Sequence, residues 1–221
     1  YAKGGGLTVW DALAWKELYS LDGQSNIAWS PNGSKLATGS GLAQGLGSMV
    51  SVWDAASGQK IHGLKVPDYS INTIAWSHDD SKLAACGNKR KAKIQRKLYW
   101  FHPSFYEGLV VIWDANSGRE FHKIEGHKYY VGDLAWSPDG TKLASCDGLN
   151  LEIFQTGPNP PPVVIPPEAN LVKIWDALSG KELHRIQGHP ARVSDVSWSP
   201  DGTKLLSADS VGISKLWSIP K

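Results

Sequence analysis

The feature of this sequence that most restricts its fold is a Trp-Asp dipeptide that returns four times. It stands in LTVWDA, SVWDA, VIWDA and VKIWDA, and a degenerate copy, KLWSI, follows near the C-terminal end. The shortest intervals are 43 residues, from Trp10 to Trp53, and 42 residues, from Trp175 to Trp217. Such a period predicts repeated sheet modules, each of which must stack on a neighbour to bury its apolar face.

A second tryptophan recurs in the segments Ala-Trp-Ser or Ser-Trp-Ser, at Trp29, Trp76, Trp136 and Trp198. Nine of the eleven tryptophans therefore occupy two repeated positions, and only Trp15 and Trp100 stand outside them. The unusual tryptophan content is explained by the repeat.

Each unit is predicted to contain four short strands. INTIAWS and VGDLAWS alternate small or apolar residues, as strands that line a crowded interior do. The Ser-Pro-Asp-Gly segments at 137–140 and 199–202 predict tight hairpins, because Pro presets φ and Gly accepts positive φ. The KLA segments, the Trp-Asp runs, and the segments KIHGL, EFHKI and ELHRI provide the remaining strands. No stretch shows useful helical periodicity, so the predicted fold class is all-β.

These motifs resemble the WD-repeat family of β-propellers. The resemblance extends from Leu7 to Ile219 outside three insertions, and it includes Gly-His dipeptides at 126–127 and 188–189. It implies a β-propeller of four-stranded antiparallel blades, with about four to five blade units in this chain. It also implies that the chain begins with the third and fourth strands of one blade and ends with three strands of another.

The resemblance implies a single propeller domain over residues 1–221, or a fragment of one. Propeller blades bury their faces only against neighbours, so the ring must close. Residues 16–21 can complete the last blade beside residues 215–219, which gives about four blades. Alternatively, the ring is larger and is completed by further chain or by a second copy.

Charge, hydropathy and cysteine usage limit the classes of partner and the compartment that are expected. A net charge of +2 is too small to indicate a nucleic-acid partner by itself. No apolar run reaches 18 residues, so no membrane span is predicted. The chain begins at Tyr1 without an initiator Met and looks processed or truncated; the cytoplasm is the expected compartment. Cys86 and Cys146 occupy equivalent, small-residue positions in two repeats and are predicted to be buried free thiols.

The resemblance implies that each Gly-His histidine staples its blade through a second-strand serine and a third-strand tryptophan. The two predicted groups are His127, Ser145 and Trp175, and His189, Ser207 and Trp217. The usual loop aspartate of this network is replaced by Ala169 and Val211. Asp147 or Asp209 would have to substitute for it.

Two aspartates stand apart from the turn-forming aspartates of the Trp-Asp pairs. Asp133 and Asp195 open the inner strand, where Asn26 and Thr73 stand in the other units. The resemblance places this end of the strand near the mouth of the central channel. Two carboxylates there can bind a cation or a basic peptide, and the alternative is backbone hydrogen bonding and hydration.

The sequence contains no enzyme signature. It has no His-Glu-x-x-His, Cys-x-x-Cys or Gly-x-Ser-x-Gly motif, and its Gly-rich stretch lacks the lysine and helix of a phosphate-binding loop. We therefore predict no catalytic residue, cofactor or metal site, and a protein that is not an enzyme.

The three insertions, residues 40–48, 88–108 and 148–170, all fall between the second and third strands of successive units. The resemblance places them on one rim, together with the Gly-His connections. Loops of such length in a compact repeat are usually functional or disordered. The prolines of the third insertion favour a semi-rigid polyproline arm that packs over its neighbour.

The second insertion carries a basic run without acidic residues, followed at once by aromatic rings. The cations are Lys89, Arg90, Lys91, Lys93, Arg96 and Lys97, and the first rings are Tyr99, Trp100 and Phe101. Such side chains can bind an acidic peptide or single-stranded nucleic acid. Alternatively, the cations are solvated and the rings pin the loop to the propeller. Among macromolecular partners, an acidic protein segment is favoured over nucleic acid.

The predicted function is a non-catalytic scaffold that binds a protein or peptide through the insertion-bearing rim. Further contact residues are predicted at Tyr129, Tyr130, Asp133, Arg192 and Asp195. The alternative is a small-ligand or glycan sensor that uses the rim rings of Tyr99, Trp100, Tyr129 and Tyr130.

Overall fold

The computed structural model describes residues 6–21, 26–39, 48–90, 106–149 and 166–220. These residues form seventeen strands and no helix, which confirms the all-β prediction. In the part of the chain so described, nothing helical is therefore long and apolar enough to cross a membrane.

Strands that follow one another in sequence pair antiparallel within five sheets. The first sheet has two strands, β1 (Leu7–Asp11) and β2 (Lys16–Leu21). The first blade contains β3 (Asn26–Trp29), β4 (Lys35–Gly39), β5 (Ser48–Asp54) and β6 (Lys60–Val66). The second contains β7 (Ser70–Trp76), β8 (Lys82–Arg90), β9 (Tyr106–Asp114) and β10 (Glu120–His127). The third contains β11 (Tyr130–Trp136), β12 (Lys142–Gly148), β13 (Val172–Asp176) and β14 (Glu182–Ile186), and the fourth has only β15 (Val193–Trp198), β16 (Lys204–Asp209) and β17 (Ser214–Ser218).

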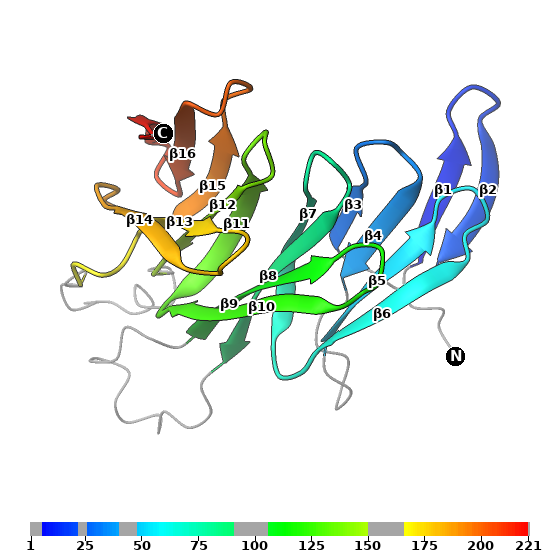
Figure 1. Cartoon of the computed structure of the whole chain (residues 1–221), viewed down its shortest axis with the longest axis horizontal. Coiled ribbons are helices and arrows are strands. Elements are labelled where there is room, and N and C mark those ends of the chain that lie inside the picture. The colour runs from blue at the N-terminus through cyan, green and yellow to red at the C-terminus, as the bar shows by residue number, and fades with distance from the viewer. Residues whose placement is uncertain (1–5, 22–25, 40–47, 91–105, 150–165, 221) are drawn as a thin grey trace, which may run out of the picture.

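The sheets succeed one another in sequence order along an open arc (Figure 1). The first strands of the four blades contact one another from blade to blade, so β3, β7, β11 and β15 form the inner layer. The chain ends lie at opposite ends of the arc (Figure 1). The first three blades therefore each have a face toward the preceding sheet and a face toward the following one.

The hairpins that join the first two strands of each blade share one turn geometry. Gly140 and Gly202 have φ of 64° and 68°, as the Ser-Pro-Asp-Gly segments predict, and Gly33 of the related segment Ser-Pro-Asn-Gly at 30–33 has a φ of 70°. The second blade has Asp80 at this place, with a φ of 58° that a non-glycine residue rarely adopts. Its turn is nevertheless closed by the same kind of bond, from Asp80 N to Ser77 O at 3.0 Å.

The hydrophobic core lies between successive blades. At the first junction, Ala37, Val50 and Val52 pack against Ile74 and Trp76 of the next blade, and all five are buried. The same arrangement returns between the second and third blades and between the third and fourth. The second strand carries a fully buried alanine at each contact, at Ala37, Ala84 and Ala144, and this small side chain lets neighbouring sheets approach closely.

The two cysteines belong to these junctions. Cys86 and Cys146 are both fully buried and free, as predicted. Burial raises the pKa of the Cys86 thiol to about 12, with the nearby Asp133 carboxylate as a second cause, so the thiol stays protonated and unreactive.

The ends of the arc show the predicted phasing, because the chain begins with a two-stranded sheet and ends with a three-stranded one. Val9 and Leu21 of the first sheet pack on Leu36 of the first blade. The four-blade ring in which residues 16–21 complete the last blade is not formed. Instead, β2 pairs with β1, since the hairpin that joins them holds the two strands together at the other end of the arc.

Candidate interaction face

The three insertions leave the sheets at one end. Residues 40–47, 91–105 and 150–165 each separate the second strand of a blade from the third. Because the strands alternate in direction, the connections from each blade to the next lie at this same end. We call this end of the blades the insertion face, and the opposite end, with the Ser-Pro-Asp-Gly hairpins, the turn face.

The predicted blade network is formed in the third blade, beneath the insertion face. The Trp175 indole donates to Ser145 Oγ at 2.7 Å, and Ser145 Oγ lies 2.7 Å from His127 Nε2. His127 Nδ1 lies 2.7 Å from Asp147 Oδ2. Gly126 precedes this histidine because a Cβ there would lie 2.5 Å from the Trp175 ring. All four side chains are buried, and the network satisfies their polar atoms.

The fourth blade repeats this network. His189 contacts Ser207 Oγ at 2.7 Å and Asp209 Oδ2 at 3.0 Å, and the Trp217 indole donates to Ser207 Oγ at 2.8 Å. Asp147 and Asp209 therefore supply the carboxylates at the end of the second strand. Each also accepts a backbone N–H from across its loop, from Leu171 at 3.0 Å and Ile213 at 2.9 Å.

The pKa of Asp209 is lowered although burial acts to raise it. The N–H of Ile213 and the ring of His189 both favour the carboxylate and outweigh the loss of solvent. The carboxylate of this network is therefore ionised at neutral pH.

Tyr129 does not present its ring on the insertion face, contrary to the prediction. Only 4% of it is exposed, and it packs with Leu149 and Ala169. Ala169, which stands where the family network usually has an aspartate, instead helps to enclose this ring. The correction removes one of the four rings on which the sensor alternative depended, and Tyr99 and Trp100 lie outside the described residues.

Tyr130 and Arg192 do come together on the insertion face. The Arg192 guanidinium carbon lies 5.2 Å from the Tyr130 ring centroid, and Tyr106 meets that ring edge-on at 5.5 Å and 86°. The three side chains come from the third blade, the connection to the fourth, and the start of β9 in the second. We call them the Tyr-Arg cluster. Among the described residues Arg192 forms no ion pair, so no carboxylate of that part of the chain occupies its guanidinium donors.

Only the start of the basic run is described. Lys89 lies in β8, 3.3 Å from Asp68, and its Nζ is 5.9 Å from the Tyr69 ring centroid. The insertion predicted at 88–108 is shorter than expected, because β8 continues to Arg90 and β9 begins at Tyr106. The remaining predicted residues, Lys91, Lys93, Arg96, Lys97, Tyr99, Trp100 and Phe101, lie outside the described residues.

Asp133 and Asp195 differ in their surroundings. Asp133 Oδ2 accepts the N–H of Val196 at 3.2 Å, which joins the third blade to the fourth. Thr73, at the same strand position in the second blade, also bonds across a junction, but as the donor: its hydroxyl donates to Gly132 O at 3.1 Å. The pKa of Asp133 is raised, first by burial and then by Asp195 among other groups. Asp133 therefore bonds to the backbone, as the alternative interpretation expected, whereas Asp195 is exposed. Within the described ranges, no three His, Cys, Asp or Glu side chains cluster as a metal site.

A second set of staples, which sequence reasoning missed, joins the outer strands. Tyr19 Oη donates to Ala55 O at 2.7 Å, His62 Nε2 lies 2.8 Å from Asn116 O, and His122 Nε2 lies 2.7 Å from Leu178 O. Each ring reaches the Trp-Asp turn of the next sheet. A signal existed, because Tyr19, His62 and His122 share one strand position, but the sequence does not show what lies opposite them.

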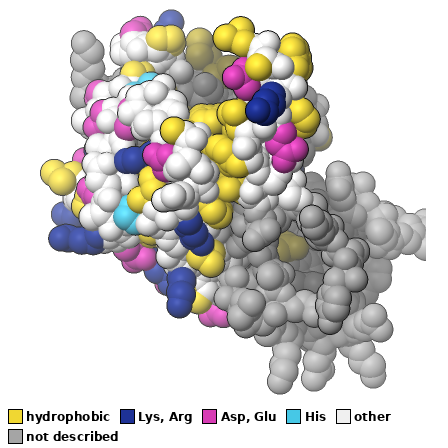
Figure 2. Space-filling model, turned by 90° about the vertical axis from the view of Figure 1, so that its right-hand side faces the viewer, with side chains coloured by type: hydrophobic (Ala, Val, Ile, Leu, Met, Phe, Trp, Pro, Cys, Tyr) yellow, Lys and Arg dark blue, Asp and Glu magenta, His cyan; other side chains and the backbone are white. Residues whose placement is uncertain are grey.

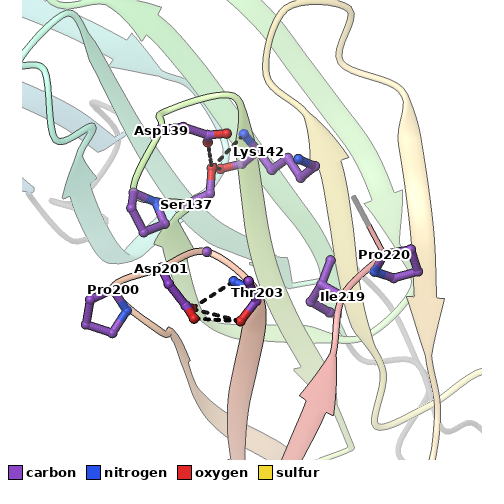
Figure 3. Close-up of a pocket in the computed structure, with 10 residues that line it drawn as sticks. Ser137, Asp139, Lys142, Pro200, Asp201, Thr203, Ile219 and Pro220 are labelled. Carbon is purple, nitrogen blue, oxygen red and sulfur yellow. Dashed lines mark hydrogen bonds between the residues drawn. The ribbon is translucent and has the colours of Figure 1, made fainter.

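The turn face has a hollow of about 320 Å³ between the hairpins of the third and fourth blades (Figure 3). Its carboxylates are already engaged. Asp139 accepts from Ser137 Oγ at 2.6 Å, and Asp201 accepts from Thr203 Oγ1 at 2.9 Å. The hydroxyl groups of Ser137 and Ser199, together with nearby N–H and threonine hydroxyl donors, lower the pKa of Asp139 and Asp201 to about 2. The two carboxylates of the hollow therefore already accept hydrogen bonds within their own turns.

Comparisons with known proteins agree with this architecture. The sequence matches the WD40 family, described as WD domain, G-beta repeat, over residues 15–54, 58–94, 118–150 and 180–218. It is 26% identical over 179 residues to the B-type cell cycle switch protein ccs52A of Medicago truncatula, covering 80% of this chain and 29% of that protein. It is 22% identical over 200 residues to cell division cycle 20.6, cofactor of APC complex, of Arabidopsis thaliana, covering 87% and 37%.

The chain thus spans less than half the length of these relatives. Among solved structures, the hydrazine synthase of Kuenenia stuttgartiensis superposes with a TM-score of 0.71 at 14% identity, over 98% of this chain and 66% of that one. At this identity the likeness shows the fold alone. With four repeat matches that cover most of the sequence, and blades that carry the predicted network, the chain belongs to the WD40 repeat family of β-propellers.

Proposed function

We propose that this chain is a non-catalytic scaffold that binds a protein or peptide with an acidic segment through its insertion face. The observation that carries the proposal is the Tyr-Arg cluster. The Arg192 guanidinium is held over a tyrosine ring while it has no carboxylate partner among the described residues. A guanidinium in this state can form paired bonds to a carboxylate of another molecule.

Three other described cations differ from Arg192 in being paired within the chain. Lys89, Lys123 and Lys128 lie 3.3, 3.1 and 3.5 Å from the carboxylates of Asp68, Glu125 and Glu168. Their charge is therefore already compensated within the chain. The basic run that continues beyond Lys89 to Lys97 contains no acidic residue in the sequence, which supports an acidic partner.

The comparisons support a role in assembly. The Arabidopsis relative is named as a cofactor of the APC complex, which is a role beside other proteins. Because the chain covers about a third of such relatives, the partners of those proteins are not assigned to it.

A hydrolytic reading of Asp147, His127 and Ser145 is disfavoured by geometry. Their order and spacing resemble a nucleophile–base–acid relay. However, Ser145 is 0% exposed and its oxygen also accepts the Trp175 indole. A nucleophile must reach a substrate, and this hydroxyl is enclosed, so the relay is structural.

The test is binding of a fluorescent peptide rich in Asp and Glu to the 221-residue chain, measured by anisotropy. We expect Arg192→Ala to weaken binding by about ten-fold, since a charge-assisted pair at the anchor is lost. Lys181→Ala removes an exposed lysine from the turn face and should leave the affinity unchanged. Circular dichroism and the melting temperature establish that both variants keep the fold.

Deletion of residues 91–105 should also weaken binding, because it removes four of the six cations of the basic run. If both Arg192→Ala and this deletion bind the peptide as well as the parent chain, the insertion face is not the binding site. Equal binding of a neutral peptide of the same length would reject the acidic class of partner.

A further inference from the structure

The first and fourth blades, at the two ends of the arc, expose surfaces that are complementary in the way that the facing surfaces of neighbouring blades are. The three internal junctions share a hydrogen bond of 3.1 Å, in which an inner-strand indole donates to the carbonyl of the preceding blade. The pairs are Trp76 with Ala28 O, Trp136 with Ala75 O, and Trp198 with Ala135 O. The corresponding donor at the first blade is Trp29 and the corresponding acceptor at the fourth is Ser197 O. No such bond to either is formed among the described residues.

The fourth blade exposes apolar side chains on the face that should be covered by a following blade. Leu206 and Leu216 pair across β16 and β17 and are 46% and 64% exposed. Their counterparts in the third blade, Ala144 and Ile174, are fully buried against the fourth.

The first blade exposes the opposite half of the same junction. Ile27 and Trp29 are 53% and 50% exposed, whereas their counterparts in the third blade, Leu134 and Trp136, are 4% and 3% exposed. Figure 2 views the molecule from this end and shows hydrophobic side chains uncovered on it. The first sheet cannot cover them, because it has only β1 and β2 at the outer half of a blade.

The free edge of β17 also matches β2 in charge. In the third blade, Lys173 Nζ reaches Glu182 of the outer strand at 3.2 Å and donates to Gly126 O. Lys215 occupies the same position in the fourth blade, where it donates to Gly188 O, and none of the described strands lies on the outer side of β17. Glu17 is the residue of β2 at the position of Glu182, since each pairs with the Trp-Asp tryptophan of its sheet.

We propose that the fourth blade is completed by β2 of a second copy of this chain. In the resulting sheet, Leu216 lies opposite Tyr19 and Trp217 opposite Glu17, the register that β13 and β14 show in the third blade. Lys215 of one copy then pairs with Glu17 of the other. Leu206 and Leu216 pack over Ile27 and Leu36 of the second copy, and its Trp29 donates to Ser197 O.

β17 of one copy takes the place of β1 in the other, because a blade has room for one third strand. The replacement of β1 by β17 is favoured by the surroundings of the tryptophan in each strand. Trp217 is bonded to Ser207 in its own blade, whereas the indole of Trp10 is 56% exposed. In β1, Thr8 stands at the place of Lys215, so the exchange also gives Glu17 a cation that it lacks among the described residues.

Within the 221-residue chain, β2 lies at the far end of the arc from β17 (Figure 1), so it is the β2 of another copy that can reach this edge. The contact is head to tail, because the fourth blade of one copy meets the first blade of the next. Each copy at the end of such an assembly therefore keeps one uncovered sheet face until a ring closes. The proposal is independent of the acidic partner, because it uses the ends of the arc and not the insertion face.

The test is the mass of the 221-residue chain in solution, by light scattering over a dilution series. We expect a multiple of the chain mass that dissociates on dilution. Lys215→Glu and Glu17→Lys should each weaken association by about ten-fold, through like charges at the contact, and the double variant should restore it. Lys65→Glu, the same charge change at an exposed lysine of β6, should have no effect.

Carbodiimide coupling identifies the contact directly, since it joins a lysine amine to a carboxylate that it touches. We expect an amide between Lys215 and Glu17 in a species of two chain masses. A chain that stays a monomer at every concentration, association that neither charge reversal weakens, or the same amide within a single chain would each overturn the proposal.

Discussion

Ser145 is the point at which the polar network of the third blade converges. Its oxygen accepts the Trp175 indole, and its proton is left for His127 Nε2, whose other nitrogen donates to Asp147. Every donor thus has an acceptor in a place that water does not reach. The residue is a structural centre because removal of one hydroxyl leaves two buried partners unsatisfied.

We therefore expect Ser145→Ala to lower the free energy of unfolding by about 2–4 kcal/mol, which is the cost of two unpaired buried polar groups. Urea unfolding followed by tryptophan fluorescence measures it. Ser117→Ala is the control, because Ser117 bonds an exposed turn carboxylate and its loss should cost less than about 1 kcal/mol. Equal effects of the two substitutions would contradict the role of the network.

The carboxylates of the turn face make stability depend on acid pH. The pKa values of Asp79, Asp139 and Asp201 are lowered to about 2, first by a serine hydroxyl that donates to each. Because an unfolded aspartate titrates near about 3.9, this stabilisation is complete above that pH and is lost as the pH falls toward 2. The melting temperature should therefore fall between pH 4 and pH 2. The triple Asp→Asn variant should show a shallower slope, and an unchanged slope would contradict the assignment.

The outer strands are tied to the following sheet by a ring at one position. Tyr19, His62 and His122 each bond a carbonyl in the next Trp-Asp turn, and each ring packs on the turn glycine. Gly58, Gly118 and Gly180 leave the space for these rings and have φ near 70°. The staples act between elements that are more than 30 residues apart in sequence, and they hold each blade's edge to its neighbour.

His122→Phe should lower the free energy of unfolding by about 1 kcal/mol, because the ring can still pack while its hydrogen bond to Leu178 O is lost. The chain provides a matched control. His184 occupies the same strand position in the third blade, yet it makes no such bond among the described residues, so His184→Phe should have little effect. Thermal unfolding of both variants tests this, and equal losses would reject the staple.

The whole molecule is a stack of sheets in which the second and third blades are covered on both faces and the sheets at the two ends on one face only. The second and third blades each have a neighbour on either side, whereas β1–β2 and β15–β17 have one. Hydrogen exchange should therefore show the lowest protection in β1 and β17 and the highest in β8, β9 and β12, measured at concentrations at which the chain is monomeric. Uniform protection along the chain would mean that the stack opens only as one unit.

The sequence by itself determined the blade. The period, the turn residues and the alternation of apolar residues are local signals, because they act within about forty residues along the chain. They predicted the strands and the hairpin glycines. The contacts of His127 and His189 with their serines and tryptophans were implied by the resemblance to the WD-repeat family. The same signals predicted Cys86 and Cys146 as buried free thiols.

What lies between blades was decided by the tertiary structure. The burial of Tyr129, the use of Asp133 across a junction, the outer-strand staples and the pairing of β2 with β1 all depend on which surface faces which neighbour. Alternation shows to which face of a sheet a side chain points, but it does not show which residues it packs against. Contacts between separate sheets are set by how whole faces fit together, and that fit exists only once the blades are stacked.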